Sequence, residues 1–323
     1  MRRSDVARAA LVSVGLLAPL SAAAPAAAYC RTTTISVPAD FQPRIDQCWD
    51  QGRPLFWRNA CVGYSIQKDA SRQVSYDDAS QAITRAFTRW TSATCPTDGT
   101  STSRASIDVR DLGPADCAIV RYNQDFANQH VIVFRDDQWP HSDVNNTLAL
   151  TTVTFNPETG EIYDADMEVN TFQQKVALTD PVPSDGYDFA SIVTHETGHF
   201  LGLAHSGDSH ATMFAHYQPG STAMRNLTSD DVAGICSVYQ PNGQRTLKGG
   251  ATVPEDACDP TPRHGFTTQC APAVKKGCTG NAIAPAPRTD AETAGAAAVM
   301  AGALLAWRRK RSARTTARCR KHL

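Results

Sequence analysis

One stretch of eleven residues, 195–205, limits what this chain can be more than any other feature: it reads His-Glu-Thr-Gly-His-Phe-Leu-Gly-Leu-Ala-His. On a helix, His195 and His199 are four residues apart and project from one face, so their imidazoles can share one metal ion. Gly202 can leave the helix with a positive φ and turn the chain sharply, so that His205 supplies a third nitrogen. The segment therefore predicts a helix that ends near Gly202 and carries a metal site.

The donor types indicate which metal and which chemistry. Three neutral imidazoles and a water molecule form the open four-coordinate arrangement of catalytic zinc, whereas oxygen donors would favour magnesium or calcium. Glu196 stands beside the first histidine and can reach that water without binding the ion, which makes it the candidate general base. A histidine pair on a helix is often only a surface feature. With Glu196, Gly202 and His205 the pattern fixes five residue types, and such a pattern occurs by chance in about one chain in ten thousand.

The same stretch, followed by Met213, resembles the long zinc-binding signature and the Met-turn of the metzincin peptidases. Among metzincins it is most similar to the matrixins. Ser206 follows the third histidine as it does in matrixins, and Met213–Tyr217 is close to the matrixin Met-Tyr-Pro-x-Tyr. Leu227–Ile235 resembles the helix that closes matrixin catalytic domains, and Asp77–Trp90 resembles their first helix.

This resemblance covers roughly residues 57–240, and it implies a fold, an activity and a set of site residues. The expected fold is α+β, with a twisted mixed β-sheet, a zinc-binding active-site helix, a Met-turn and a C-terminal helix. The expected activity is zinc endopeptidase, with His195, His199 and His205 as ligands and Glu196 as base. Proteins or peptides would be the substrates, bound along an edge strand at 148–153 and in a pocket walled by 214–224.

Three departures from the matrixin pattern lead to further expectations. Ile162 stands where matrixins have a histidine ligand of a second, structural zinc, so we expect that zinc to be absent. Asp164, Asp166 and Glu168 either hold calcium or form a solvated acidic strand end. A matrixin propeptide with its inhibitory cysteine and a propeller-like C-terminal domain are also not expected.

Hydrophobic periodicity places the regular elements. Apolar residues at helical spacing predict helices, and β-branched or aromatic runs predict strands. Asp188 and Thr228 or Ser229 are candidate N-caps for the second and third helix. The predicted helices are 76–90, 189–203 and 229–239, and the predicted strands are 64–66, 130–134, 148–155 and 161–169, with a turn at 156–160.

Both ends of the chain carry targeting signals. Residues 1–28 have a positive start, an apolar run and a small-residue cleavage site, which predicts a secretory signal rather than an apolar first helix. Residues 293–311 combine a short uncharged run with four basic residues, which favours a membrane or sorting signal over a soluble helix. With Cys278, this tail resembles the surface-sorting tails of myxobacterial exported proteins. The remaining expected segments are a cysteine-containing segment at 29–56, a catalytic domain at 57–245, a linker at 246–292 and a basic tail at 312–323.

Charge and cysteine content support export and exclude one class of partner. Residues 29–307 carry 20 Lys and Arg against 31 Asp and Glu, so the folded part is too acidic to bind nucleic acid. Apart from Cys278 and Cys319, eight of the ten cysteines remain, an even number that suits four disulfides of open connectivity. The protein is therefore expected to be secreted or held at the cell surface.

Two rival functions and several histidines complete the prediction. Gly207-Asp208-Ser209 is a weak serine-esterase signal, and the chain could instead be a non-catalytic surface adhesion module that keeps a zinc-peptidase fold. The sequence leaves open the substrate, the control of latency, the oligomeric state and the fate of the tail. The other histidines are expected to be polar surface residues, of which two, His210 and His216, could line the cleft: His130, His141, His210, His216 and His264.

Overall fold

A mixed β-sheet forms the centre of the computed structural model, which describes residues 28–38, 40–96, 103–241, 245–246, 252–253, 259–270 and 318–321. Its strands are β2 (Cys61–Gln67), β5 (Asp108–Ala115), β6 (Val131–Phe134), β7 (Ala149–Phe155), β8 (Ile162–Val169) and β14 (Arg318–Lys321). They lie in the order β14-β7-β8-β6-β2-β5. β5, β2, β6 and β8 are parallel, while β7 is antiparallel to both β8 and β14. The predicted α+β class with a mixed sheet is confirmed.

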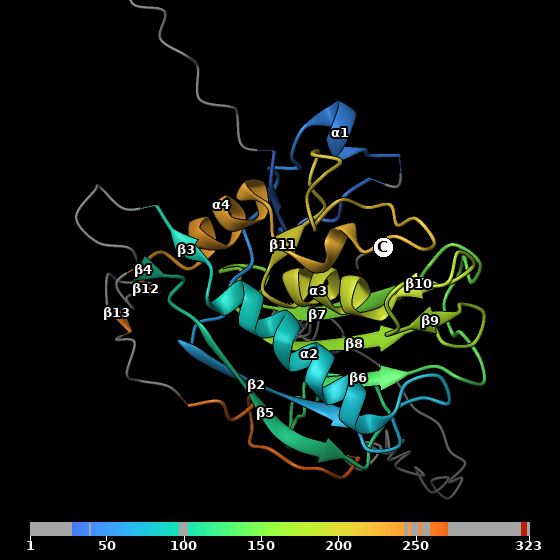
Figure 1. The fold of residues 1–323 in the computed structure, drawn as a ribbon. Coiled ribbons are helices and arrows are strands. Elements are labelled where there is room, and N and C mark those ends of the chain that lie inside the picture. The colour runs from blue at the N-terminus through green and yellow to red at the C-terminus, as the bar shows by residue number, and fades with distance from the viewer. Residues whose placement is uncertain are drawn as a thin grey trace, which may run out of the picture.

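Helices α2 (Tyr76–Thr91) and α3 (Phe189–Phe200) lie across one face of this sheet (Figure 1). The predicted apolar stripe of α2 is buried, and its last large residue, Trp90, donates from Nε1 to the carbonyl oxygen of Thr194 at 2.8 Å. Helix α4 (Ser229–Val238) begins with a capping box between Thr228 and Asp231. The contact of Trp90 fixes α3, which carries the predicted metal ligands, beside α2 on this face of the sheet.

Short elements complete the fold around α3. Strand β1 (Cys30–Arg31) pairs antiparallel with β11 (Leu203–Ala204), immediately before His205. The predicted cysteine-containing segment therefore packs against the loop that carries the third histidine. The other short elements are α1 (Pro43–Asp46), β3 (Thr94–Cys95), β4 (Ser103–Arg104), β9 (Val176–Ala177), β10 (Tyr187–Asp188), β12 (Arg245–Thr246), β13 (Thr252–Val253) and a 3-10 turn at Ala223–Arg225.

Two elements differ from the sequence prediction for physical reasons. Helix α3 ends at Phe200 rather than 203, because Gly202 adopts a φ of 96° and a Cβ there would lie 2.8 Å from the carbonyl oxygen of Leu55. Strand β5 was not predicted at all. It is an edge strand with mostly solvated side chains and a Gly113-Pro114 pair, so it lacks the alternating apolar pattern of a buried strand.

Disulfides join segments that lie around the sheet, as expected for an exported chain. Three join described residues: Cys30–Cys48, Cys95–Cys236 and Cys117–Cys270. Cys61 is disulfide-bonded as well. Because of the third bond, residues 259–270, which lie inside the predicted linker, pack against the sheet domain; Asn128 donates to the carbonyl oxygen of Arg263 at 2.7 Å.

The predicted targeting signals lie outside the described residues. This applies to 1–27 of the secretory signal and to the run at 293–311 with Cys278. Within the described parts of the chain, no helix has the length and apolarity that a membrane crossing requires. The four residues of β14 fall within the predicted basic tail.

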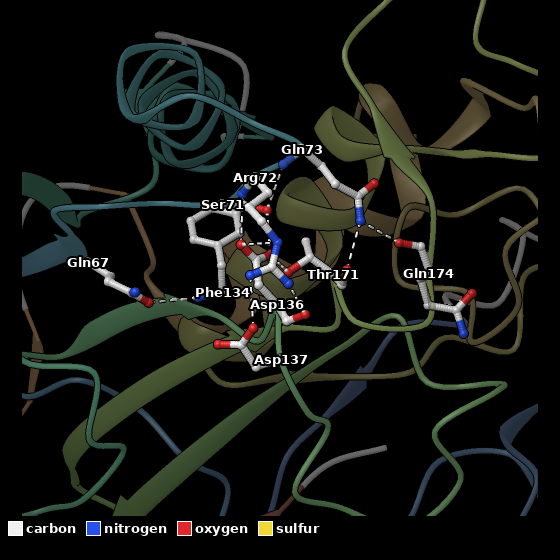
Figure 2. A network of polar contacts seen from close by, with 9 residues as sticks. All are labelled: Gln67, Ser71, Arg72, Gln73, Phe134, Asp136, Asp137, Thr171 and Gln174. Atoms are coloured by element: carbon white, nitrogen blue, oxygen red, sulfur yellow. Dashed lines mark hydrogen bonds and ion pairs between the residues drawn. The ribbon is translucent and has the colours of Figure 1, made fainter.

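A polar network ties the loop between β2 and α2 to the ends of β6 and β8 (Figure 2). Its centre is Asp136, which accepts hydrogen bonds from the Ser71 hydroxyl and the Arg72 backbone at 2.7 Å each, and from the Thr171 hydroxyl. The neighbouring Asp137 pairs with the Arg72 guanidinium at 2.8 Å at the surface. The network fixes the chain where it leaves β6 and β8.

Candidate metal centre and active site

Helix α3 brings the first two predicted ligands together in a dry environment. His195 and His199 are 2% and 3% exposed, and their Nε2 atoms are 3.1 Å apart. The Nδ1 atom of His195 lies 2.7 Å from the carbonyl oxygen of Thr212, and that of His199 lies 2.9 Å from that of Leu203. A carbonyl only accepts, so each Nδ1 carries the proton and each Nε2 presents a lone pair. Two lone pairs at this distance repel, and a cation between them would remove the repulsion.

The third ligand arrives through the turn at Gly202. Thr32 fixes this turn, since its backbone N–H donates to the carbonyl oxygen of Gly202 at 3.0 Å. The ligand atoms of all three histidines then lie within 4.8 Å of one another. Donors on a tetrahedral zinc ion are roughly 3.4 Å apart, as bonds of about 2.1 Å require. The residues therefore fit the predicted zinc, which His195, His199 and His205 would hold.

Burial keeps these imidazoles in the form that binds a metal. It lowers the pKa of His195 to about 4. Burial, reinforced by the neighbouring His195, lowers the pKa of His199 to about 3. Neutral imidazoles carry the free lone pairs that a metal ion needs, so protons compete weakly for these two ligands at neutral pH.

Glu196 lies beside the three histidines and is 5% exposed. Burial raises its pKa to about 7, although a hydrogen bond from Thr151 opposes this shift. The Oγ1 atom of Thr151 donates to Oε2 of Glu196 at 2.6 Å. A carboxyl with a pKa near neutrality can both take and return a proton, which suits a general acid–base. Thr151 was missed by the sequence reasoning, because a threonine in a strand gives no signal of its own.

The predicted Met-turn packs directly beneath the two helical histidines. Met213 is 2% exposed, and a Cβ on Gly198 would come within 2.3 Å of its sulfur, so only glycine fits at that point of α3. The buried carboxylate of Asp231 accepts from the backbone N–H groups of Thr212 and Met213 at 2.8 and 3.0 Å. Asp230 beside it accepts from the Ser206 hydroxyl at 2.7 Å. These two aspartates hold the turn against α4, and the sequence reasoning assigned them only to a helix start.

A cavity of about 480 Å³ is lined in part by the predicted pocket wall at 214–224 and in part by residues of 187–191 and 209–211. His210 and His216 lie on its wall, as the sequence allowed. Tyr217 reaches from this wall toward the metal site, with its ring centroid 5.3 Å from that of His195. Among the other lining residues are Tyr187, Ser191, Phe214, Gln218 and Met224.

The opposite face of the sheet holds a second buried polar cluster, which corrects two expectations. Asp164, Asp166 and Glu168 are 2–3% exposed and so do not form a solvated strand end. His130 is 2% exposed, so its assignment to the surface was wrong; its Nδ1 lies 2.7 Å from the carbonyl oxygen of Gly63. The burial of these residues was not predicted, because the alternation of side chains along a strand does not show which face of the sheet other segments cover.

These carboxylates have protein partners of their own. Glu168 pairs with Arg135 and with His141, each at 2.7 Å, and Asp166 accepts from the backbone of Val131 at 2.7 Å. Across the described residues, three metal-ligating atoms converge only at His195, His199 and His205. The calcium expectation therefore gains no support from this arrangement.

Comparisons with known proteins agree with this geometry. The Matrixin family pattern matches residues 56–240, which is more than half of the chain. Metalloendoproteinase 1-MMP of Arabidopsis thaliana is 29% identical over 67% of this chain and 52% of its own length. Neutrophil collagenase of Homo sapiens is 29% identical over 64% and 38%, and matrix metalloproteinase-C of Caenorhabditis elegans 27% over 60% and 30%. The chain thus spans about half or less of the length of these relatives. With the signature, the Met-turn and the fold in place, the chain belongs to the matrixin family of metzincin zinc metallopeptidases.

Proposed function

We propose that this chain is an exported zinc-dependent endopeptidase that hydrolyses peptide bonds of proteins, with Glu196 as the general base. The observation that carries the proposal is the convergence of the ligand atoms of His195, His199 and His205 within 4.8 Å of one another, beside the buried carboxyl of Glu196. A zinc ion on the three imidazoles would lower the pKa of water to about 7 and polarise the scissile carbonyl. The three disulfides and the predicted secretory signal support export.

The protein's own residues would do the remaining chemistry. Glu196 takes a proton from the attacking water and returns it to the nitrogen of the leaving amine, so one carboxylate acts first as base and then as acid. The carbonyl oxygens of Thr212 and Leu203 keep His195 and His199 in the tautomer that offers Nε2. Burial excludes bulk water and strengthens each of these contacts.

An extended substrate would pair with β7, the strand next to α3. In support, the edge of β7 that faces away from β8 already pairs with an antiparallel strand of the same chain, since Thr152–Phe155 pair with β14. Main-chain pairing of this kind is tolerant of sequence, so the side chain that enters the 480 Å³ cavity would decide the preference. A substrate strand that covers more of β7 than 149–151 would displace β14.

Casein cleavage by the zinc-loaded protein, with and without 1,10-phenanthroline, tests the proposal, and Glu196→Gln tests the role of the base. We expect chelator-sensitive cleavage that falls by about a thousandfold or more in Glu196→Gln, with one zinc per chain retained in that variant. Full activity in Glu196→Gln would refute the mechanism. A zinc-loaded wild-type protein that cleaves neither casein nor gelatin would favour the alternative, a surface adhesion module on a zinc-peptidase fold.

A further inference from the structure

The hydroxyl of Thr151 meets the side chain of Glu196 inside the protein. Its Oγ1 lies 2.6 Å from Oε2 of Glu196 and 3.3 Å from the backbone carbonyl oxygen of the same residue. Thr151 is 0% exposed and Glu196 is 5% exposed. Both neighbours of the hydroxyl are acceptors, so the hydroxyl must donate. A hydrogen bond to a carboxylate in so dry a place is stronger than one at the surface.

The sheet holds this hydroxyl at a fixed position. Thr151 lies in β7 and pairs with Met167 of β8, and the residues that follow it in β7 are paired with both β8 and β14. A β-branched side chain also has few rotamers, so the direction of Oγ1 is set by the backbone. The side chain of Glu196, by contrast, has three rotatable bonds and must place its carboxylate within a fraction of an ångström to act on the water.

From this contact we infer that Thr151 is a positioning residue for Glu196. Its hydroxyl holds Oε2, so that the other oxygen, Oε1, faces the water that attacks the peptide bond. The inference rests on the function proposed above for Glu196. In this role the Thr151 hydroxyl acts through the Glu196 carboxylate, whereas the pairing of β7 with a substrate would use backbone atoms.

The test compares three substitutions in the full, zinc-loaded chain. Thr151→Val keeps the shape of the side chain and removes the hydroxyl, whereas Thr151→Ser keeps the hydroxyl. Thr171→Val is the matched control, because the buried Thr171 also donates its hydroxyl to a carboxylate, that of Asp136, in the network away from the histidines. We expect kcat for a peptide substrate to fall about 10- to 100-fold in Thr151→Val, with KM and zinc content unchanged.

Thr151→Ser is expected to keep kcat within about threefold of the wild type, and Thr171→Val should match the wild type in kcat per folded molecule. A merely structural role for Thr151 predicts another pattern, in which Thr151→Val lowers the melting temperature and leaves kcat per folded molecule intact. That pattern would overturn the inference, and so would a kcat as low in Thr151→Ser as in Thr151→Val.

Binding of acetohydroxamate supplies a readout that does not depend on turnover. Its hydroxyl proton needs a carboxylate acceptor beside the metal, so Thr151→Val should weaken binding in the wild-type background and have no effect in a Glu196→Gln background. Equal weakening in both backgrounds would overturn the inference. The two proposals also fail separately: an active Glu196→Gln refutes the base, whereas an inactive Glu196→Gln with a fully active Thr151→Val refutes only the positioning role.

Discussion

Two buried polar clusters lie on the two sides of strands β7 and β8. Both contain histidines and carboxylates, but the contacts between their atoms differ. On the helix side, the two Nε2 lone pairs of α3 face each other at 3.1 Å, because both Nδ1 protons go to backbone carbonyls. On the other side, Glu168 has a guanidinium and an imidazole at 2.7 Å each. Three histidine ligand atoms that converge on one point indicate a metal site, whereas a carboxylate with two cationic partners indicates a structural role.

The largest effect that tests this comparison is expected when one histidine of each cluster is replaced by alanine. His205→Ala should lose the zinc, and because even supporting residues of metal sites cost 10- to 100-fold, we expect activity to fall by at least about a thousandfold. His141→Ala removes one partner of Glu168 and should cost about 1–3 kcal/mol of unfolding free energy with activity per folded molecule retained. Zinc content, kcat and urea unfolding of both variants measure this. A loss of zinc in His141→Ala would contradict the comparison.

The first cluster could be predicted from the sequence and the second could not, for a physical reason. The zinc ligands lie within eleven residues, so the geometry of one helix and one glycine turn was enough to place them. Glu168 meets Arg135 and His141 only after strands far apart in the chain pair in register. The same holds for Thr151, which is 45 residues from Glu196 in sequence. Spacing predicts local sites, whereas contacts between strands depend on the whole sheet.

The next largest effect is expected for the carboxylate at the centre of the second cluster. Glu168→Gln leaves the half-buried guanidinium of Arg135 against a neutral amide, and breaking this partly buried pair should cost about 2–3 kcal/mol of unfolding free energy. Because the cluster lies across the sheet from the histidines, kcat per folded molecule should stay within about twofold of the wild type. Urea unfolding and active-site titration check both parts. A large drop in kcat without a stability loss would mean that the second cluster is functional.

His130 gives the second cluster a pH dependence. Burial lowers its pKa to about 4 in the folded protein, against an ordinary value of 6.5. Protons therefore bind the unfolded chain more readily, and stability falls as the pH drops below 6.5, by up to about 1.4 kcal/mol per pH unit until about pH 4. His130→Gln should remove this slope. Asp164, which faces His130, and Asp166 have pKa values that burial raises, and they give the opposite trend in both proteins, so the slope is compared between the wild type and the variant.

Unfolding free energies of the wild type and His130→Gln at pH 7, 6 and 5 measure this difference. His210→Gln is the control, since the His210 side chain is 87% exposed and its removal should leave the slope unchanged. Parallel stability curves for the wild type and His130→Gln would show that His130 is not kept neutral by burial.

The smallest effect is expected in the polar network of Figure 2. Its carboxylate, Asp136, has hydrogen-bond partners as Glu168 does, but it is less buried, so it shows how much burial adds. Burial alone would raise the pKa of Asp136, but the hydrogen bonds that it accepts, that of Thr171 foremost, bring it below its ordinary value. A depressed folded-state pKa means that the carboxylate stabilises the protein above the unfolded value and loses this effect as the pH falls. Asp136→Asn should therefore lower the free energy of unfolding by about 1–2 kcal/mol at pH 7 and by less at pH 3.

Asp137→Asn is the control and should have no measurable effect. Its side chain is 88% exposed, although it also pairs with Arg72. Equal losses in the two variants would mean that charge near Arg72, rather than satisfied hydrogen bonds, stabilises this end of the sheet.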